Sequence, residues 1–258
     1  MIKFTIVTCT FQAENVIGRT MESVLHQTFR RVEHLIVDGA SRDRTVTLAR
    51  AYKEQSDAMA NGHEVCVVSE PDGGLYDAMN KGIRKAKGDY VVFLNAGDVL
   101  PSPMTLELIS RRAGASDDLP GVLFGDTDIV DDAGRFLRHR RLSPPERLTW
   151  KSFRRGMLVC HQAFYARTDL ARHCPYDLQY RYSADVDWCI RVMREASERG
   201  LRLMNLHAVV VNYLDGGMTV KNHRASLRER FRVMSHHYGL FTTVAMHVWF
   251  VVRSIFRR

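Results

Sequence analysis

Two aspartates stand where a carboxylate could do chemistry in this chain. Asp98 comes just after the apolar run of residues 91–94, and Asp185 lies in the segment YSADVDWCIR. An acid at the end of a buried strand can hold a divalent cation, Mg²⁺ or Mn²⁺, which offsets the charge that grows on a diphosphate leaving group. A second acid that does not spend its charge on the metal can deprotonate an acceptor hydroxyl.

Each aspartate also has an ordinary structural explanation. Asn, Gly and Asp are common turn formers, so residues 95–98 could be a simple turn after a strand. With Ser183 as N-cap, Asp185 and Asp187 fall in the first turn of a helix, where acids complement the helix dipole. Spacing alone leaves both explanations open, and for Asp185 it favours the structural one.

The first hundred residues alternate between short apolar strands and helices. The predicted strands are residues 2–10, 32–38, 64–69 and 89–94. The predicted helices between them are residues 14–28, 41–55 and 75–88. Apolar, β-branched runs separated by helices of this length predict an α/β fold with a mostly parallel central sheet and helices on both faces. Ligands of such sheets bind outside the carboxyl ends of the strands, where polar residues and glycines gather in this chain.

The pattern is looser after residue 115. Residues 121–141 predict a hairpin, and residues 183–200 predict an amphipathic helix. We expect one domain over residues 1–222 and a basic, amphipathic C-terminal helical extension over 223–258. The nearly apolar residues 239–252 are too few to span a bilayer, which needs about 20. They suit either an interfacial helix at a membrane or a terminal helix packed on the domain.

Composition and charge narrow the class of protein. The chain is 45% hydrophobic and 26% charged, as in ordinary globular proteins. Its five cysteines show no CxxC spacing, which argues against a zinc knuckle or disulfide framework and favours the cytoplasm. The net charge of +8 is concentrated in residues 134–155 and 224–258, which indicates an anionic partner. No GxGxxG or GxxxxGK[ST] motif follows the first strand, so dinucleotide-binding Rossmann and P-loop sites are excluded.

Several motifs in the chain resemble the family 2 glycosyltransferases of the GT-A fold. They are TIVTCTFQAENVIGRTMESVLHQTF, LIVDGASRDRT and SEPDGGLYDAMNKGIRKAKGDYVVFLNAGD, followed by VLFGDTDI, VCHQAFYAR, YSADVDWCIR and DGGMT. Within that family the chain looks most like bacterial exopolysaccharide enzymes of the colanic acid type. The resemblance fades after about residue 222.

The resemblance implies a metal-dependent, inverting hexosyltransferase. Such an enzyme moves a sugar from a UDP- or GDP-sugar to a hydroxyl of an acceptor, here a lipid-linked saccharide in surface glycan assembly. The implied location is cytoplasmic, with the basic C-terminus meeting the anionic inner face of the membrane.

The same resemblance assigns roles to individual residues. The nucleotide and donor contacts fall on Thr10, Phe11, Glu14, Asp38, Asp72, Asn80, Lys81 and Asn95. The metal ligand falls on Asp98 and the general base on Asp185. Secondary candidates for acceptor or donor contact are His161, Gln162, Asp187 and Arg191.

The chain departs from the family pattern at two motifs. Many relatives have a pair of acids where this chain has Asp38-Gly39, so the contact to the base can differ and the choice of UDP or GDP stays open. The metal motif often reads Asp-x-Asp-Asp, whereas residues 95–98 read Asn-Ala-Gly-Asp here. With fewer acids, the ion would be held mainly by Asp98 and the diphosphate.

Two other functions are weighed against transfer of a sugar. A non-catalytic nucleic-acid-binding protein would fit the pI of about 9.4, but base-stacking aromatics among the basic residues are lacking, and so is a recognisable module. A sugar nucleotidyltransferase would need a loop rich in glycine and Arg or Lys after the first strand, and none is present. We therefore expect no nucleic-acid partner.

Overall fold

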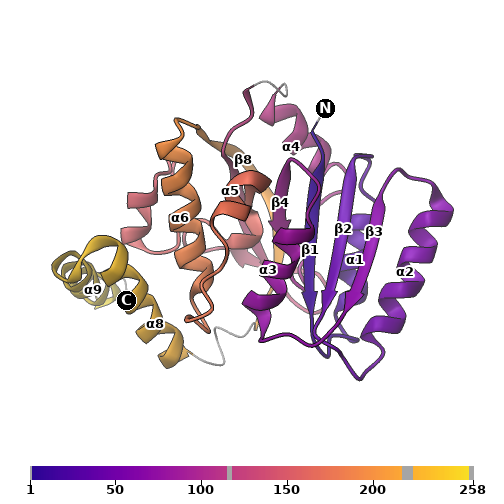
Figure 1. Cartoon of the computed structure of the whole chain (residues 1–258). Coiled ribbons are helices and arrows are strands. Elements are labelled where there is room, and N and C mark those ends of the chain that lie inside the picture. Colours follow the sequence, from indigo (N-terminus) through magenta and orange to yellow (C-terminus); the bar gives the residue numbers. More distant parts are fainter. Residues whose placement is uncertain (1, 115–117, 217–222, 256–258) are drawn as a thin grey trace.

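The computed structural model describes residues 2–114, 118–216 and 223–255 as a mixed α/β fold with a central sheet between helices (Figure 1). Its strands are β1 (Phe4–Thr10), β2 (Val32–Asp38), β3 (Glu64–Ser69), β4 (Tyr90–Phe93), β5 (Val122–Val130), β6 (Phe136–His139), β7 (Phe164–Arg167) and β8 (Leu203–Leu214). Its α-helices are α1 (Ile17–Leu25), α2 (Thr45–Met59), α3 (Leu75–Lys85), α4 (Thr105–Ala113), α5 (Thr168–His173), α6 (Ala184–Glu198), α8 (His223–Tyr238) and α9 (Leu240–Ile255). Two 3₁₀ segments, η2 (Trp150–Arg155) and η3 (His161–Ala163), precede β7.

The first four strands form the predicted parallel sheet. In the described chain the strand order is β3-β2-β1-β4-β7-β5-β6, with β8 paired to β5, and β1 pairs in parallel with both β2 and β4. Helix α2 begins four residues later than predicted. Asp43 Oδ1 accepts a hydrogen bond from the Thr45 amide at 3.0 Å, and Glu14 Oε2 accepts one from the Arg44 amide at 2.9 Å. These side chains hold residues 41–44 as a loop before the helix.

The second half of the sheet is mixed rather than parallel. β7 runs antiparallel to β4, and β5 runs antiparallel to both β7 and β6, which confirms the predicted hairpin. η3 lies beside the carboxyl end of β4, where His161 contacts Asn95, so β7 starts at that edge and must run back along β4. This reversal brings η3 to the edge at which ligands of α/β sheets bind.

Helices cover both faces of the parallel half (Figure 1). Ile17 of α1 and Tyr52 of α2 pack with Ile36 on one face. Met79 of α3 packs with Val7 in the larger core on the other face. Because both faces are covered, β1, β2 and β4 are buried throughout, as continuous apolar strands require.

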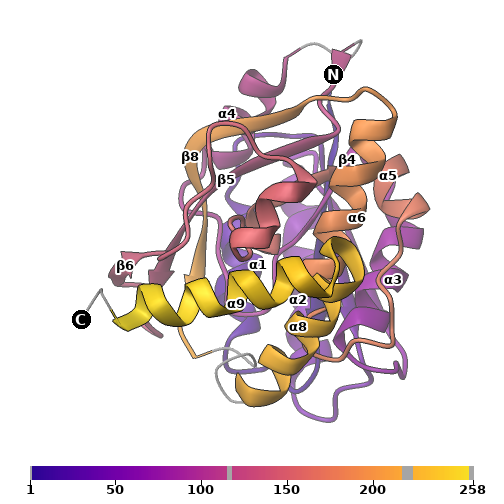
Figure 2. The same ribbon diagram turned by 90° about the vertical axis from the view of Figure 1, so that its left-hand side faces the viewer.

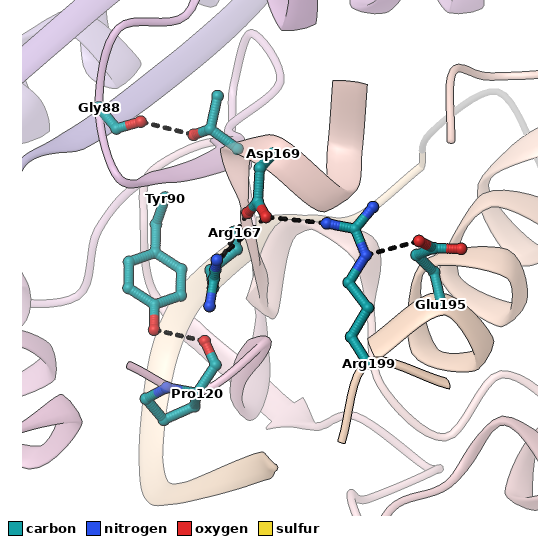
Figure 3. Close-up of polar contacts among 8 residues, drawn as sticks. Gly88, Tyr90, Pro120, Arg167, Asp169, Glu195 and Arg199 are labelled. Atoms are coloured by element: carbon teal, nitrogen blue, oxygen red, sulfur yellow. Dashed lines mark hydrogen bonds and ion pairs between the residues drawn. The ribbon is translucent and has the colours of Figure 1, made fainter. Parts of the chain in front are cut away.

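The C-terminal end of α6 is tied to β7 and α5 by a chain of ion pairs (Figure 3). Asp169 accepts hydrogen bonds from Arg167 and from Arg199, each at 3.0 Å. Arg199 also donates to Glu195 of α6 at 2.6 Å. In the same region the Tyr90 hydroxyl donates to the Pro120 carbonyl at 2.6 Å. α6 is therefore anchored at the end remote from Asp185.

The C-terminal residues form a helical pair, α8 and α9, at the side of α6 (Figure 2). Val233 and Met234 of α8 are buried, and Tyr238 stacks on Trp150 with ring centroids 5.8 Å apart. α9 leaves apolar side chains exposed along one stripe, namely Leu240, Phe241, Val244, Val248, Trp249 and Val252. Among the described residues, no helix is both long and apolar enough to cross a membrane. The predicted boundary after residue 222 adjoins residues 217–222, which lie outside the described residues, as do Arg257 and Arg258.

Candidate functional site

Two adjoining cavities open at the carboxyl edge of the parallel strands. One, of about 900 Å³, is lined by the strand ends and by the start of α3. The other, of about 690 Å³, reaches the turn after β4, η3, the start of α6 and the middle of α8. The residues that line both are Cys9, Thr10, Phe11, Leu75, Tyr76, Arg181 and Tyr182. We call the first the strand-end cavity and the second the η3 cavity.

The end of β1 forms the rim between the two cavities. Thr10 is buried and donates to Asp38 Oδ1 at 3.0 Å, whereas Phe11 is 66% exposed. Asp38 lies behind this rim, and its carboxylate also accepts bonds from the Ser41 amide and hydroxyl and from the Ser69 hydroxyl. Its oxygens are thus occupied within the protein. Asp38 therefore holds the end of β1 in place. The exposed ring of Phe11 is available to stack on a ligand.

Asp72 lies over the backbone of Gly39. A Cβ atom at position 39 would come within 2.7 Å of Asp72 Oδ2. The place of a second acid after Asp38 is therefore taken by the Asp72 carboxylate, which lines the strand-end cavity. Lys81 supports this loop from behind, because its Nζ donates to the Pro71 carbonyl at 2.7 Å and pairs with Glu70.

Asp98 is buried at the floor of the η3 cavity. Its Oδ2 accepts a hydrogen bond from Gln162 Nε2 at 3.0 Å, and its Oδ1 accepts one from the Leu214 amide at 2.9 Å. Burial raises the pKa of Asp98 to about 6, although both hydrogen bonds oppose this shift. Gly97 makes the turn possible: its φ is +102°, and a Cβ there would meet Leu214 Cδ2 at 2.7 Å.

The floor of the η3 cavity suits a divalent cation in one respect. Asn95 Oδ1 is buried and has no hydrogen-bond partner among the described residues, although it belongs to the turn that carries Asp98. A hard cation prefers oxygen ligands, and an amide oxygen beside a carboxylate supplies two of them. In the described chain there is no group of three or more His, Cys, Asp or Glu side chains that could hold an ion. A metal ion here would need further coordinating oxygens from a small molecule bound in the cavity.

Asp185 faces the η3 cavity from the first turn of α6. Its Oδ1 accepts a bond from the Tyr76 hydroxyl at 3.3 Å, and its Oδ2 lies 3.4 Å from His161 Nδ1. Burial alone would raise the pKa of Asp185, but the contact with His161 and the charge of Arg230 outweigh it and lower the pKa. Asp185 therefore stays a carboxylate at neutral pH and can accept a proton.

η3 brings consecutive residues to the two acids. His161 reaches Asp185 with Nδ1, and its Nε2 lies 3.3 Å from Asn95 Nδ2, while Gln162 holds Asp98. Arg140 holds the backbone just before η3 in place, because its guanidinium donates to the Met157 and Leu158 carbonyls. The motif CHQ thus contacts both aspartates at one point of the cavity.

Six of the sequence-predicted residues line neither cavity: Glu14, Asp38, Asn80, Lys81, Asp187 and Arg191. The Asn80 amide is engaged with both the amide and the carbonyl of Tyr176. Glu14 holds the loop before α2. Asp187 accepts bonds at 2.7 Å from both Arg191 and His237. These contacts give Glu14, Asn80, Asp187 and Arg191 structural positions.

Sequence reasoning missed three residues that line the η3 cavity, Tyr76, Arg181 and Arg230. Tyr76 is the second residue of α3 and lies inside one of the family motifs, although the resemblance assigns it no role. Arg181 stands alone between Tyr180 and Tyr182, and Arg230 is one of many arginines of the basic C-terminal extension, which predict an anionic partner but single out no residue. Arg230 Nε is buried and has no hydrogen-bond partner among the described residues, a feature that sequence cannot show.

The family model described as Glycosyl transferase family 2 matches residues 5–173. A PGL/p-HBAD biosynthesis glycosyltransferase of Mycobacterium bovis (strain BCG / Pasteur 1173P2) is 31% identical over 219 residues, which are 83% of this chain and 77% of the relative.

Two solved structures share the fold. S. aureus TarS 1–349 in complex with UDP-GlcNAc has a TM-score of 0.69 at 16% identity, covering 95% of this chain and 70% of that one. The mannosyltransferase PcManGT from Pyrobaculum calidifontis, in complex with GDP-Man and Mn²⁺, has a TM-score of 0.60 at 17% identity, covering 95% and 74%. At such identities the likeness concerns the fold, and it confirms the predicted GT-A architecture.

Proposed function

The chain belongs to glycosyl transferase family 2, and we propose that it moves a sugar from a nucleotide-diphospho-sugar to an acceptor hydroxyl in the two adjoining cavities, with inversion at the anomeric carbon. The observation that carries this proposal is the contrast between two acids on one cavity. Burial raises the pKa of Asp98 to about 6, whereas His161 and Arg230 lower that of Asp185 against the effect of its own burial. The contacts differ in the same way, because Asp98 lies on the turn of the unpaired Asn95 oxygen, whereas Tyr76 and His161 hold Asp185. Two acids in such different environments can take different roles.

The nucleotide would occupy the strand-end cavity. Phe11 offers a ring for stacking on the base. The Asp72 carboxylate can accept a hydrogen bond from an N–H of the base or from a hydroxyl of the ribose. The UDP-GlcNAc and GDP-Man complexes of the two structural neighbours support a nucleotide-sugar donor. UDP and GDP both remain candidates for this chain.

A divalent cation, Mg²⁺ or Mn²⁺, would be held by Asp98 with the Asn95 amide oxygen and the donor phosphates. When bound it supplies positive charge to the leaving diphosphate. Arg181 and Arg230 line the same cavity and add to that charge. The Mn²⁺ in the PcManGT complex supports metal dependence.

Asp185 would act as the general base. It takes the proton of the acceptor hydroxyl while that oxygen forms a bond to the anomeric carbon. The bond between the anomeric carbon and the phosphate oxygen breaks, and the nucleoside diphosphate leaves with its electron pair. Tyr76 and His161 contact the two oxygens of Asp185 and so orient the carboxylate toward the cavity.

The acceptor would be a lipid-linked saccharide in surface glycan assembly, met at the inner face of the cytoplasmic membrane. The exposed apolar stripe of α9 supports this, because such a helix face suits the interfacial zone of a bilayer. The relative named for PGL/p-HBAD biosynthesis is a glycosyltransferase too. The proposed glycan is an exopolysaccharide of the colanic acid type or another surface glycan, as the sequence motifs imply.

The test is a binding screen with purified protein. Thermal shifts would be recorded with UDP-, GDP- and other nucleotide sugars, with and without Mn²⁺. We expect one nucleotide to raise Tm, and Mn²⁺ to enlarge that rise, since a ligand that binds only the folded state stabilises it. The absence of a shift with every nucleotide sugar at millimolar concentration would refute the proposal.

A further inference from the structure

Helix α8 presents one face to the start of α6. Ser226, Glu229, Arg230, Val233 and His237 follow the spacing of a single helical face. Ser226 and Val233 are buried, and His237 contacts Asp187 of α6. α8 thus packs directly on the helix that carries Asp185, although it lies beyond the residues matched by the family model.

Glu229 caps the N-terminus of α6 from outside that helix. Its Oε1 accepts a hydrogen bond from the Arg181 amide at 2.9 Å, and its Oε2 accepts bonds from the Tyr182 amide at 2.6 Å and the Ser183 amide at 3.0 Å. Of these three amides, that of Ser183 is the N-cap amide, which has no acceptor inside the helix, and the other two belong to the segment that leads into it. A carboxylate at this end also complements the helix dipole.

Ser183 does not perform this task, although the sequence predicts it as the N-cap. It occupies the N-cap position without a capping hydrogen bond, and its hydroxyl donates to the Ser226 carbonyl of α8 at 3.2 Å. The N-cap amide of α6 and the two amides before it are therefore held by a distant helix. The conformation of residues 181–183 depends on where α8 lies.

The capped segment also forms the wall of both cavities. Arg181 and Tyr182 line the strand-end cavity and the η3 cavity, and Asp185 follows within one turn of α6. One carboxylate on α8 thus fixes the backbone on which two wall residues and the proposed base are placed. The remote end of α6 is held separately through Glu195 and Arg199 (Figure 3).

We propose that Glu229 is a positioning residue for Asp185, so that α8 belongs to the transfer site rather than to an appended tail. This inference rests on the proposed function, in which Asp185 is the general base. Loss of the cap would displace Asp185 from the acceptor hydroxyl while Phe11 and Asp72 stay in place. A misplacement of about 1 Å can cost about a hundredfold in rate.

The test compares Glu229→Ala and Glu229→Gln with Glu195→Ala. We expect Glu229→Ala to lower kcat by about tenfold to a hundredfold and to raise the Kd of the nucleotide by a smaller factor, because Arg181 and Tyr182 also line the strand-end cavity. Glu229→Gln keeps the chain length and one acceptor oxygen, so its kcat should be intermediate. Glu195→Ala breaks a tie at the far end of α6 and should keep kcat near that of the unaltered protein.

Amide hydrogen exchange of a peptide covering residues 178–187 gives a readout that needs no catalysis. Glu229→Ala should speed exchange in this peptide, and Glu195→Ala should not. An unchanged kcat in folded Glu229→Ala, or an equal loss in Glu195→Ala, would overturn the proposal. If the unaltered protein transferred no sugar, the proposed function would fail instead, and unchanged exchange in Glu229→Ala would separately contradict the capping role.

Discussion

Phe11 offers a sharp test of the nucleotide site, because its ring is free in the protein alone. About two-thirds of the residue is exposed, at 66%, so Phe11→Ala leaves no internal cavity and should not lower stability. A fully buried Phe side chain is worth about 1.5 to 3 kcal/mol, so covering this exposed part with a base is worth about 1 to 2 kcal/mol. That energy corresponds to a loss of about fivefold to thirtyfold in affinity.

The assay is isothermal titration calorimetry with UDP and GDP, accompanied by thermal unfolding. We expect Phe11→Ala to weaken binding of the preferred nucleotide by this factor and to keep Tm within about 1 °C. Phe136→Ala is the matched control, because Phe136 of β6 is also largely exposed, at 56%, but lines neither of the two cavities. Equal Kd values for Phe11→Ala and the unaltered protein would refute the assignment of the strand-end cavity to the nucleotide.

Three further predictions concern the turn that carries Asp98. Asp98→Asn should abolish the Tm rise caused by Mn²⁺ in the presence of the nucleotide, and a rise of the original size would remove Asp98 as a ligand. Because burial raises the pKa of Asp98 to about 6 from 3.8, the folded state keeps its proton between about pH 4 and 6 while the unfolded chain loses it. The metal-free protein should therefore lose up to about 3 kcal/mol of stability from this group as pH rises through that window. Mn²⁺ should consequently stabilise more at pH 7.5 than at pH 5 in urea unfolding, and equal effects at both pH values would contradict this. Gly97→Ala should cost about 1 to 3 kcal/mol, since residue 97 has a φ of +102° and its Cβ would clash with Leu214, and unchanged urea unfolding would disprove that strain.

The parallel half of the fold could be predicted because its signals are local. β2 and β3 have the predicted bounds, since each is a short apolar run closed by polar residues on both sides. The reversal at β7 could not be predicted from pattern. It depends on η3 reaching the carboxyl end of β4, which is a contact between residues 66 positions apart.

Site residues that lie in a motif could be predicted from the sequence. Those that reach the site only through packing between distant segments could not. Asp98 and Asp185 were found through motifs, and the structure places both at the η3 cavity. Asp38 was expected to meet the ligand, yet hydroxyls from the ends of β1 and β3 and from the loop before α2 occupy its carboxylate. Arg230 and Glu229 belong to α8, and their neighbours at and just before the start of α6 lie more than forty residues earlier in the chain. Only the packing of the two helices shows what they contact.

The most direct test of the account is the release of nucleoside diphosphate from the preferred donor with an acceptor, compared between the unaltered protein and Asp185→Asn. Asp185→Asn keeps the shape of the side chain but removes the base. We predict donor binding within about twofold of the unaltered protein and a rate of transfer lower by about a hundredfold to ten-thousandfold. Transfer by Asp185→Asn at the original rate would contradict the assignment of Asp185 as the general base.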